Sequence, residues 1–457
     1  MSVIKGLGPS NSLQKTKKRS FYLLIPCFLL ALFLFSGCTN QFMDQILGHK
    51  ISGNGTLKNP FRVYDEEDLR KVGSDIDGWS LDAHYRQERN ITGMSKEWEP
   101  IGNYTNNAPF TGTYNGNGKS ISTIRITPAG ESCKGMFSYI LHPGEVKNLR
   151  LNVDIDLGTW NVAGAVAGRN EGGLIQNCNV TGKISSQTEA GGIAGVNTNS
   201  TSPVNTGIIQ YCISKIYIYN SGETVGGIAG NNEEGLIQNC YSTGDIGSTG
   251  QNVGGIAGYN ENGTIQSCYS KSNISGNNSV GGIIGYNFNG LLKNCYSTGE
   301  IDCTGDNIGG IVGFNSGNVE YCYATGNVNG NRNVGGIAGD NISTVNNCVA
   351  LNRYIETNGD PNFGRVFGNS TDPSSLNHAR FNINNTSWII NQKNGYNIVQ
   401  SDLDSIQTFW EDPSLLIWTS PWDFNGPQFI WAWVAPYLPI LNNMPPGTQN
   451  PTIPGLP

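Results

Sequence analysis

The sequence predicts an all-β protein, a single-stranded parallel β-helix (β-solenoid) of about seven to ten coils with a cap at each end. A phrase such as VGGIAGYNENGTIQSCYSKSNI, from Val253, returns at a period of 26 to 28 residues, the mark of a repeat array. Its Gly, Asn, Ser, Val, Ile and Tyr favour turns and pleated strands over helices. One period holds three short strands and three corners, and precedent for such repeats favours a right-handed winding.

One cysteine recurs at a fixed place in the repeat, with spacings of 34, 28, 28, 27, 27 and 26 residues. This cysteine row is Cys178, Cys212, Cys240, Cys268, Cys295, Cys322 and Cys348. We expect buried free thiols that fill one seam of a narrow core. Disulfides between directly paired parallel strands need unfavourable geometry, and the spacing lacks the CxxC character of a metal site. The state of Cys133 and Cys303, outside the row, stays open.

An asparagine recurs two residues after the last glycine of each VGGIAG-like segment. This asparagine ladder is Asn170, Asn197, Asn232, Asn260, Asn287, Asn315 and Asn341. An asparagine tolerates left-handed backbone at a corner, and its amide both donates and accepts along a stack. We therefore expect a structural ladder at a corner of the coils.

Residues 1–37 read as an export signal, with a basic start, the apolar run 21–35 and small residues before Cys38. The apolar run is shorter than the roughly 20 residues of a membrane span. The pattern resembles a bacterial lipoprotein signal, which implies that Cys38 carries the lipid (palmitate). Phe35 departs from the usual signal, and an uncleaved anchor or an ordinary secretory signal stays open. Thr39 favours the outer membrane or cell surface.

The rest of the chain divides by composition. Residues 38–52 read as a tether, and 53–132 as an N-terminal cap and first coils. Here Asp65 is the expected N-cap of a helix through Val72, with Leu69 and Val72 inward. The repeats fill 133–385, with the regular part at 162–349. Residues 386–441 are expected to form a Trp-rich C-terminal cap over the last coil, with a ligand groove as the alternative, and the Pro-rich tail 442–457 is expected to be disordered. Six of nine tryptophans lie in this cap: Trp388, Trp410, Trp418, Trp422, Trp431 and Trp433.

Charge and motif content argue against several functions. Without residues 1–37 the chain keeps 23 Lys and Arg against 35 Asp and Glu, a formal charge of −12, so nucleic acid is an unsuitable partner. Four scattered histidines give no zinc-binding pattern, and no cofactor is expected. Asp245 and Glu300 hold equivalent positions two coils apart, a spacing an inverting glycosidase would accept. Asn273 lies between them, so a solvated polar row is the preferred interpretation.

Two series of aromatic residues are the candidate binding face. One follows the cysteine row directly and so should point outward, unless a corner lies at that point: Tyr241, Tyr269, Tyr296 and Tyr323. The other precedes three ladder asparagines by one position: Tyr259, Tyr286 and Phe314. Exposed aromatic rows at the coil spacing suit a glycan or a flat protein surface. Stacking without any ligand is the alternative.

The pattern VGGIAGxNxxGxIxxCYSxG resembles the GLUG repeat of bacterial surface proteins, including non-catalytic parts of IgA-specific metallopeptidases. The flanks GNGTLKNPFRVY and TSPWDFNG resemble those that such repeats carry, so the resemblance covers residues 53–441. It implies a surface role without implying an activity. We expect a lipid-anchored surface protein that binds an extracellular glycan or protein and is not an enzyme. A polysaccharide-degrading enzyme using the carboxylates, and a structural spacer, are the alternatives.

Overall fold

The computed structural model describes residues 53–128, 132–158, 161–201, 204–371, 377–380 and 396–398, together with 431–432, 438–442, 444, 448–449 and 451. The predicted signal (1–37), the predicted lipidation site Cys38 and the predicted tether (38–52) lie outside these residues. So do Trp388, Trp410, Trp418, Trp422 and Trp433 of the predicted C-terminal cap. Everything below concerns the unit that begins at Asn54.

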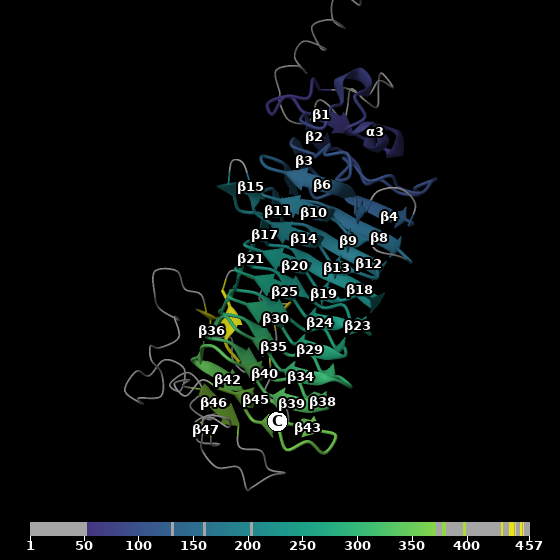
Figure 1. Ribbon diagram of the computed structural model, residues 1–457. Helices are drawn as coiled ribbons and strands as arrows, with labels where there is room; N and C mark the ends of the chain where they lie inside the picture. Colours follow the sequence, from purple (N-terminus) through teal and green to yellow (C-terminus); the bar gives the residue numbers. More distant parts are fainter. Residues whose placement is uncertain are drawn as a thin grey trace, which may run out of the picture. The chain divides into compact units, whose positions relative to one another are not determined.

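The described chain is a parallel β-solenoid of about 11 turns (Figure 1), which confirms the predicted fold class. The turns exceed the predicted seven to ten because strands ahead of the regular repeats already pair in the same stack. A regular turn runs through four sheets in chain order, here called sheets I to IV, and each strand pairs with its equivalents in the turns before and after it.

Sheet I is formed by the VGG segments. Its strands are β5 (Cys133–Lys134), β9 (Val162–Gly164), β13 (Glu189–Gly191), β19 (Thr224–Gly226), β24 (Gln251–Gly254), β29 (Asn278–Gly281), β34 (Asp306–Gly309), β39 (Arg332–Gly335) and β44 (Phe363–Gly364).

Sheet II is formed by the segments that end at the asparagine ladder. Its strands are β6 (Phe137–Leu141), β10 (Ala167–Glu171), β14 (Ala194–Thr198), β20 (Ala229–Glu233), β25 (Ala257–Glu261), β30 (Ile284–Phe288), β35 (Val312–Asn315), β40 (Ala338–Asn341) and β45 (Phe367–Ser370).

Sheet III precedes the cysteine row and reaches furthest toward the N-terminus. Its strands are β1 (Phe61–Val63), β2 (His84–Gln87), β3 (Thr113–Asn115), β7 (Glu145–Lys147), β11 (Leu174–Gln176), β17 (Ile208–Gln210), β21 (Leu236–Gln238), β26 (Thr264–Gln266), β31 (Leu291–Lys293), β36 (Asn318–Glu320) and β41 (Val345–Asn346).

Sheet IV closes each turn, with long strands early in the chain and pairs of short ones later. Its strands are β4 (Ser120–Ile126), β8 (Arg150–Asp156), β12 (Asn179–Ser185), β18 (Ile213–Ser221), β22 (Tyr241–Ser242), β23 (Ile246–Ser248), β27 (Tyr269–Ser270), β28 (Ile274–Ser275), β32 (Tyr296–Ser297), β33 (Ile301–Asp302), β37 (Tyr323–Ala324), β38 (Val328–Gly330), β42 (Cys348–Ala350), β43 (Ile355–Thr357), β46 (Asn377–Arg380) and β47 (Tyr396–Ile398).

The core is one continuous apolar column, because each turn contributes side chains at the same positions. In the turn from Val253, the fully buried apolar residues of the core are Val253, Ile256, Ala257, Ile265 and Cys268. Parallel strands about 4.8 Å apart place each of these against its equivalent in the next turn. The repeated apolar positions therefore build the stack through contacts between neighbouring turns.

The N-terminal end carries the predicted short helix, α3 (Glu66–Lys71), followed by the 3₁₀ turn η1 (Ile76–Gly78). The Asp65 side chain accepts a hydrogen bond from the Asp68 amide at 3.1 Å, so the N-cap prediction is confirmed. Leu69 and Val72 are buried, as predicted. Within the described ranges, neither helix has the length and hydropathy that a membrane crossing needs.

Two small antiparallel pairs lie outside the four sheets. Strands β15 (Ser200–Thr201) and β16 (Val204–Asn205) pair within the loop between β14 and β17. Strands β48 (Trp431–Ala432) and β49 (Ile440–Leu441) pair near the C-terminus. We call the described residues from Trp431 to Pro451 the C-terminal strap.

Candidate binding faces

The asparagine ladder is a continuous chain of buried amides. Each Nδ2 donates to the Oδ1 of the ladder asparagine in the next coil, at 2.7 to 2.9 Å, from Asn170 through to Asn341. Six of the seven also donate to the carbonyl of a following glycine, and Asn341 donates to Ser343 instead. Because every amide is fully buried, these bonds satisfy groups that would otherwise be costly to desolvate.

A glycine is required beside the ladder. A Cβ at Gly263 would lie 2.3 Å from the Asn232 Nδ2 and 2.6 Å from the Asn260 Oδ1, the two atoms that bond across this gap. Gly235 and Gly290 stand in the same relation to their own ladder pairs. The third residue after each of these asparagines therefore has no side chain because the amide chain occupies that space.

Left-handed backbone occurs elsewhere than predicted. The ladder asparagines lie within or at the end of sheet II strands and are absent from the positive-φ positions. Instead, the residue directly before each cysteine of the row has φ between +52° and +54°: Asn177, Tyr211, Asn239, Ser267, Asn294, Tyr321 and Asn347. This corner turns the chain after sheet III, so that both Ile265 and Cys268 point inward although they are three residues apart.

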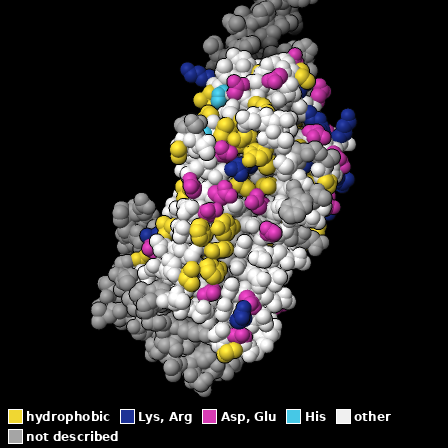
Figure 2. Space-filling model, viewed as in Figure 1, with side chains coloured by type: hydrophobic (Ala, Val, Ile, Leu, Met, Phe, Trp, Pro, Cys, Tyr) yellow, Lys and Arg dark blue, Asp and Glu magenta, His cyan; other side chains and the backbone are white. Residues whose placement is uncertain are grey.

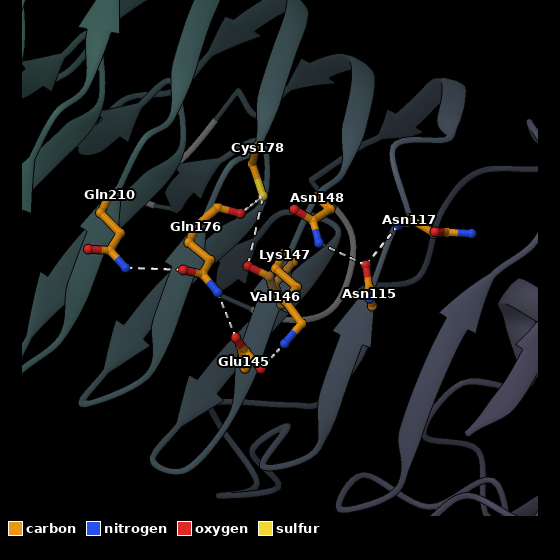
Figure 3. Close-up of polar contacts among 9 residues, drawn as sticks. All are labelled: Asn115, Asn117, Glu145, Val146, Lys147, Asn148, Gln176, Cys178 and Gln210. Carbon is orange, nitrogen blue, oxygen red and sulfur yellow. Dashed lines mark hydrogen bonds and ion pairs between the residues drawn. The ribbon is translucent and has the colours of Figure 1, made fainter. Parts of the chain in front are cut away.

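The outer side of sheet III carries a second polar ladder (Figure 3). Gln210 donates to Gln176 at 3.1 Å, and Gln176 donates to Glu145 at 2.8 Å. Lys147 pairs with the same Glu145 at 2.7 Å. Gln238 and Gln266 continue the series in the following coils. These groups satisfy one another along the solenoid, so this side offers no unpaired set of functional groups.

The cysteines of the row are buried free thiols, and so are Cys133 and Cys303. Each row thiol lies 3.2 to 3.4 Å from the carbonyl oxygen two residues before it. Burial raises the pKa of the Cys322 and Cys348 thiols, and it raises that of Cys303 to about 12. All seven row cysteines are 0% to 1% exposed, and thiols that solvent cannot reach are poor nucleophiles, so the row is part of the core.

The four tyrosines that follow the cysteine row were predicted to be exposed, and that prediction is wrong. Tyr241 is 3% exposed, and Tyr269, Tyr296 and Tyr323 are 0% exposed. They lie outside the core cluster, on the opposite side of the strand from the cysteines, as alternation requires. Their rings stack in parallel at 4.7 to 4.9 Å, with interplanar angles of 0° to 7°. We call this set the tyrosine stack.

The C-terminal strap covers the tyrosine stack. The Tyr269 hydroxyl donates to Thr448 Oγ1 at 2.6 Å, and that of Tyr323 donates to the Pro439 carbonyl at 2.7 Å. Between them, the Tyr296 hydroxyl lies 3.1 Å from Gln449 Oε1. These phenol groups are satisfied by the chain's own C-terminal segment, which corrects the prediction that the tyrosines form an open binding face.

Trp431 and Gln449 fix the strap in place. Trp431 is 1% exposed, lies 5.9 Å from Tyr323 between ring centroids, and donates from Nε1 to Asn294 at 3.3 Å. Gln449 is 1% exposed and bonds the backbone of Leu441 in both directions. Trp431 therefore packs on the side of the solenoid rather than over its last coil. Residues of the tail predicted to be disordered, such as Met444 and Gln449, are buried because they seal the aromatic surface.

The second aromatic series remains partly exposed on sheet II. We call Tyr259, Tyr286 and Phe314 the aromatic row; they face one another in register on β25, β30 and β35. Their rings meet edge to face, at 5.2 Å and 85° for the first pair and 4.8 Å and 67° for the second. Figure 2 shows hydrophobic side chains gathered over these strands, with acidic side chains beside them.

Glutamates accompany the aromatic row on the same face. Glu171, Glu233 and Glu261 each follow a ladder asparagine, so they share the outer side of sheet II with the residue two positions earlier. With Glu234, Arg169 and the β15–β16 loop they line a groove of about 480 Å³. Sequence reasoning missed this column, although the recurrence of Glu after the ladder Asn was readable in the repeat.

The carboxylates considered for catalysis lie in an exposed row of alternating acids and amides. Asn273 donates to Asp245 at 3.2 Å, and Asn327 donates to Glu300 at 3.4 Å. Asn329 donates to Asp302 at 2.8 Å. Among the described residues, no group of three or more His, Cys, Asp or Glu is placed to hold a metal ion. The row resembles the other polar ladders of this solenoid.

The chain carries five GLUG motifs. The family model described as "The GLUG motif" matches residues 161–185, 221–247, 249–275, 276–302 and 304–329, which confirms the resemblance drawn from the sequence. Over 156 residues, 32% of this chain, it is 31% identical to Halomucin of Haloquadratum walsbyi. The matched stretch spans only 2% of Halomucin's length.

One solved structure is similar in fold. It is described as "a putative immunoglobulin A1 protease from Bacteroides ovatus", with a TM-score of 0.47 and 19% identity. The similarity covers 86% of this chain and 95% of that one.

Proposed function

We propose that the protein is a non-catalytic binding protein of the bacterial cell surface, whose solenoid presents the aromatic row to an extracellular glycan or protein. The observation that carries the proposal is the state of the aromatic row. Three rings in consecutive coils are held edge to face and stay partly exposed, while the tyrosine stack on sheet IV is sealed. Aromatic rings fixed on a rigid sheet lose little conformational entropy on binding.

Two further observations support the proposal. The chain carries GLUG motifs, a repeat that resembles those of bacterial surface proteins, and over 156 residues it is 31% identical to Halomucin. The acids that a polysaccharide-degrading enzyme would use, Asp245 and Glu300, accept hydrogen bonds from neighbouring asparagine amides in an exposed row. A reaction at Glu300 would release reducing ends from a glycan and would be lost in Glu300→Gln; we expect no such release.

Binding to an array of glycans and extracellular matrix proteins tests the proposal, using the full chain. The variant Tyr259→Ala/Tyr286→Ala/Phe314→Ala should lose a selective ligand by about tenfold or more, as central aromatic contacts commonly do. The matched control is Tyr217→Ala/Tyr219→Ala, which removes two exposed rings, 57% and 43% exposed, from sheet IV. Equal binding by the triple variant and the unaltered chain would exclude the aromatic row as the contact face.

The proposal includes lipid anchoring at Cys38 in the outer membrane, supported by the signal-like residues 1–37. Cells expressing the full chain and fed a radiolabelled or alkyne-tagged palmitate should label the protein. Cys38→Ser should abolish the label and release the protein from the membrane fraction, whereas Cys27→Ser, inside the apolar run, should leave both unchanged. Labelling that survives Cys38→Ser would show that the anchor lies elsewhere.

A further inference from the structure

The acidic groove carries charge that the solenoid does not neutralise. Glu171 is paired, since Arg169 Nε lies 3.1 Å from its Oε2. Glu189, Glu233, Glu234 and Glu261 form no ion pair with any described residue. Glu233, Glu234 and Glu261 line the groove, and Glu189 lies on the neighbouring sheet I. Because the guanidinium of Arg169 is already engaged by Glu171, these carboxylates leave a negative surface beside the aromatic row.

The negative charge of these carboxylates raises the pKa of neighbouring titratable groups. Burial raises the pKa of Glu189, and the negative charge of Glu233 adds to the effect. Burial, together with the negative charges of Glu261 and Glu233, raises the pKa of Tyr259 to about 12. The glutamates and the aromatic row therefore form one electrostatic surface rather than two separate features.

A buried acceptor lies at the border between the two. Asn231 occupies the register position next to Tyr259 and is 7% exposed. Its Nδ2 donates to Glu233 Oε1 at 2.7 Å, while its Oδ1 has no hydrogen-bond partner among the described residues. A buried acceptor without a donor is uncommon, because it costs free energy unless a partner arrives.

Apolar surface continues on the other rim of the groove. Val204, on β16, lines the groove and is 75% exposed. Phe288 lies 6.2 Å from Tyr286 between ring centroids. It follows the ladder residue Asn287, at the position that Glu261 holds in the preceding coil. Negative charge, a buried acceptor and exposed apolar side chains thus occur within four consecutive coils.

From these features we infer that the partner of sheet II is a cationic polypeptide segment, with its Arg or Lys groups in the acidic groove and its apolar side chains on the aromatic row. The inference rests on the proposed function and names the class of partner. A guanidinium pairs with carboxylates that have no ion-pair partner among the described residues and stacks on tyrosine rings. Acidic glycans and nucleic acids are repelled by the same charges, and a neutral glycan would leave them uncompensated.

The test measures fluorescence anisotropy of labelled peptides with the full chain. One peptide is a 12-residue extended sequence alternating Arg and Tyr, and its counterpart carries Gln in place of Arg. We expect the Arg peptide to bind and the Gln peptide to bind at least about tenfold more weakly, with affinity falling at about 0.3 M salt. Glu233→Gln/Glu261→Gln should weaken binding of the Arg peptide about tenfold.

The matched control removes the same charge from another face. Glu300→Gln/Asp302→Asn neutralises two exposed carboxylates on sheet IV and should leave peptide affinity within about twofold, because they lie beyond the groove. Failure of the Arg peptide to bind, equal affinity for the Gln peptide, or equal losses in both variants would overturn the inference. An array ligand lost in the aromatic triple variant but indifferent to Glu233→Gln/Glu261→Gln would leave the proposed function standing and this inference refuted.

Discussion

The tyrosine stack and the aromatic row are built by the same repeat from nearly the same residues, yet they end in opposite states. The stack has parallel rings and is 0% to 3% exposed. The row has rings at 67° to 85° and stays partly exposed. The stack is covered by the C-terminal strap, whereas sheet II over the aromatic row has no described segment bonded to its rings.

The difference shows that the repeat and the flanking chain determine different things. The repeat sets which side of a strand a residue occupies and how closely its equivalents approach, about 4.8 Å per coil. Whether that side meets water is decided by a segment with no periodicity, which bonds Tyr269, Tyr296 and Tyr323 from more than a hundred residues away. Whether a sheet face of the solenoid can bind a partner therefore depends on whether another segment of the chain covers it.

Truncating one ring in each set should give the largest contrast. Tyr296→Ala removes a fully buried ring in contact with two others and with Gln449, and we expect a loss of about 3–5 kcal/mol in the free energy of unfolding. Tyr286→Ala removes a partly exposed ring and should cost about 1 kcal/mol or less. Urea unfolding followed by circular dichroism compares the two variants. Similar losses would mean that the strap does not seal the stack in solution.

Removing the strap's central hydrogen bonds should have a smaller effect. Gln449→Ala deletes the acceptor of the Tyr296 hydroxyl and both bonds to Leu441, and we expect a loss of about 1–3 kcal/mol. Its specific signature is faster cleavage after residue 430 by a protease under native conditions, with residues 54–371 left intact. Unchanged cleavage would indicate that Trp431 and the bonds from Tyr269 and Tyr323 hold the strap without Gln449.

Alkaline pH should distinguish the tyrosine stack from the aromatic row, with the smallest expected change in stability of the three tests. Burial raises the pKa of Tyr296 and Tyr323 above the ordinary value. Below about pH 10 both folded and unfolded tyrosines are protonated, and above it only the unfolded ones ionise, so stability falls as pH rises, by up to about 1.4 kcal/mol per unit for each buried group.

The control for this titration is Tyr296→Phe, which has no proton to lose and should flatten the slope between about pH 10 and 11.5 relative to the unaltered chain. Absorbance at the phenolate wavelength should show Tyr259 ionising near pH 12 in the folded protein. A slope that is the same in Tyr296→Phe and the unaltered chain would assign the alkaline loss to other groups.

Much of the fold could be read from the sequence because identical residues at a fixed period must stack. This holds for the asparagine at 170 and its equivalents, and for the outward side of the tyrosines. A corner before each row cysteine was allowed for, but its left-handed backbone was not predicted because Asn177, Tyr211 and Ser267 differ in type and share only a conformation. The strap was missed because a Pro-rich segment gives no periodic signal. The glutamates that follow the ladder asparagines, Glu171, Glu233 and Glu261, recur visibly in the repeat but were not predicted as part of a site.

The strap also limits how many coils the molecule can lose. Along sheet IV the stacked column reads Ile213, Tyr241, Tyr269, Tyr296, Tyr323 and Val349. The strap needs three phenols at its bonding positions, and the column supplies four. Loss of one whole repeat would slide Tyr241 into the place of Tyr269 and preserve every bond, whereas loss of two would bring Ile213 there and leave Thr448 without a phenol. Gain of repeats ahead of Tyr241 would leave the three bonding positions of the strap unchanged, so the strap restricts the loss of coils more than their gain.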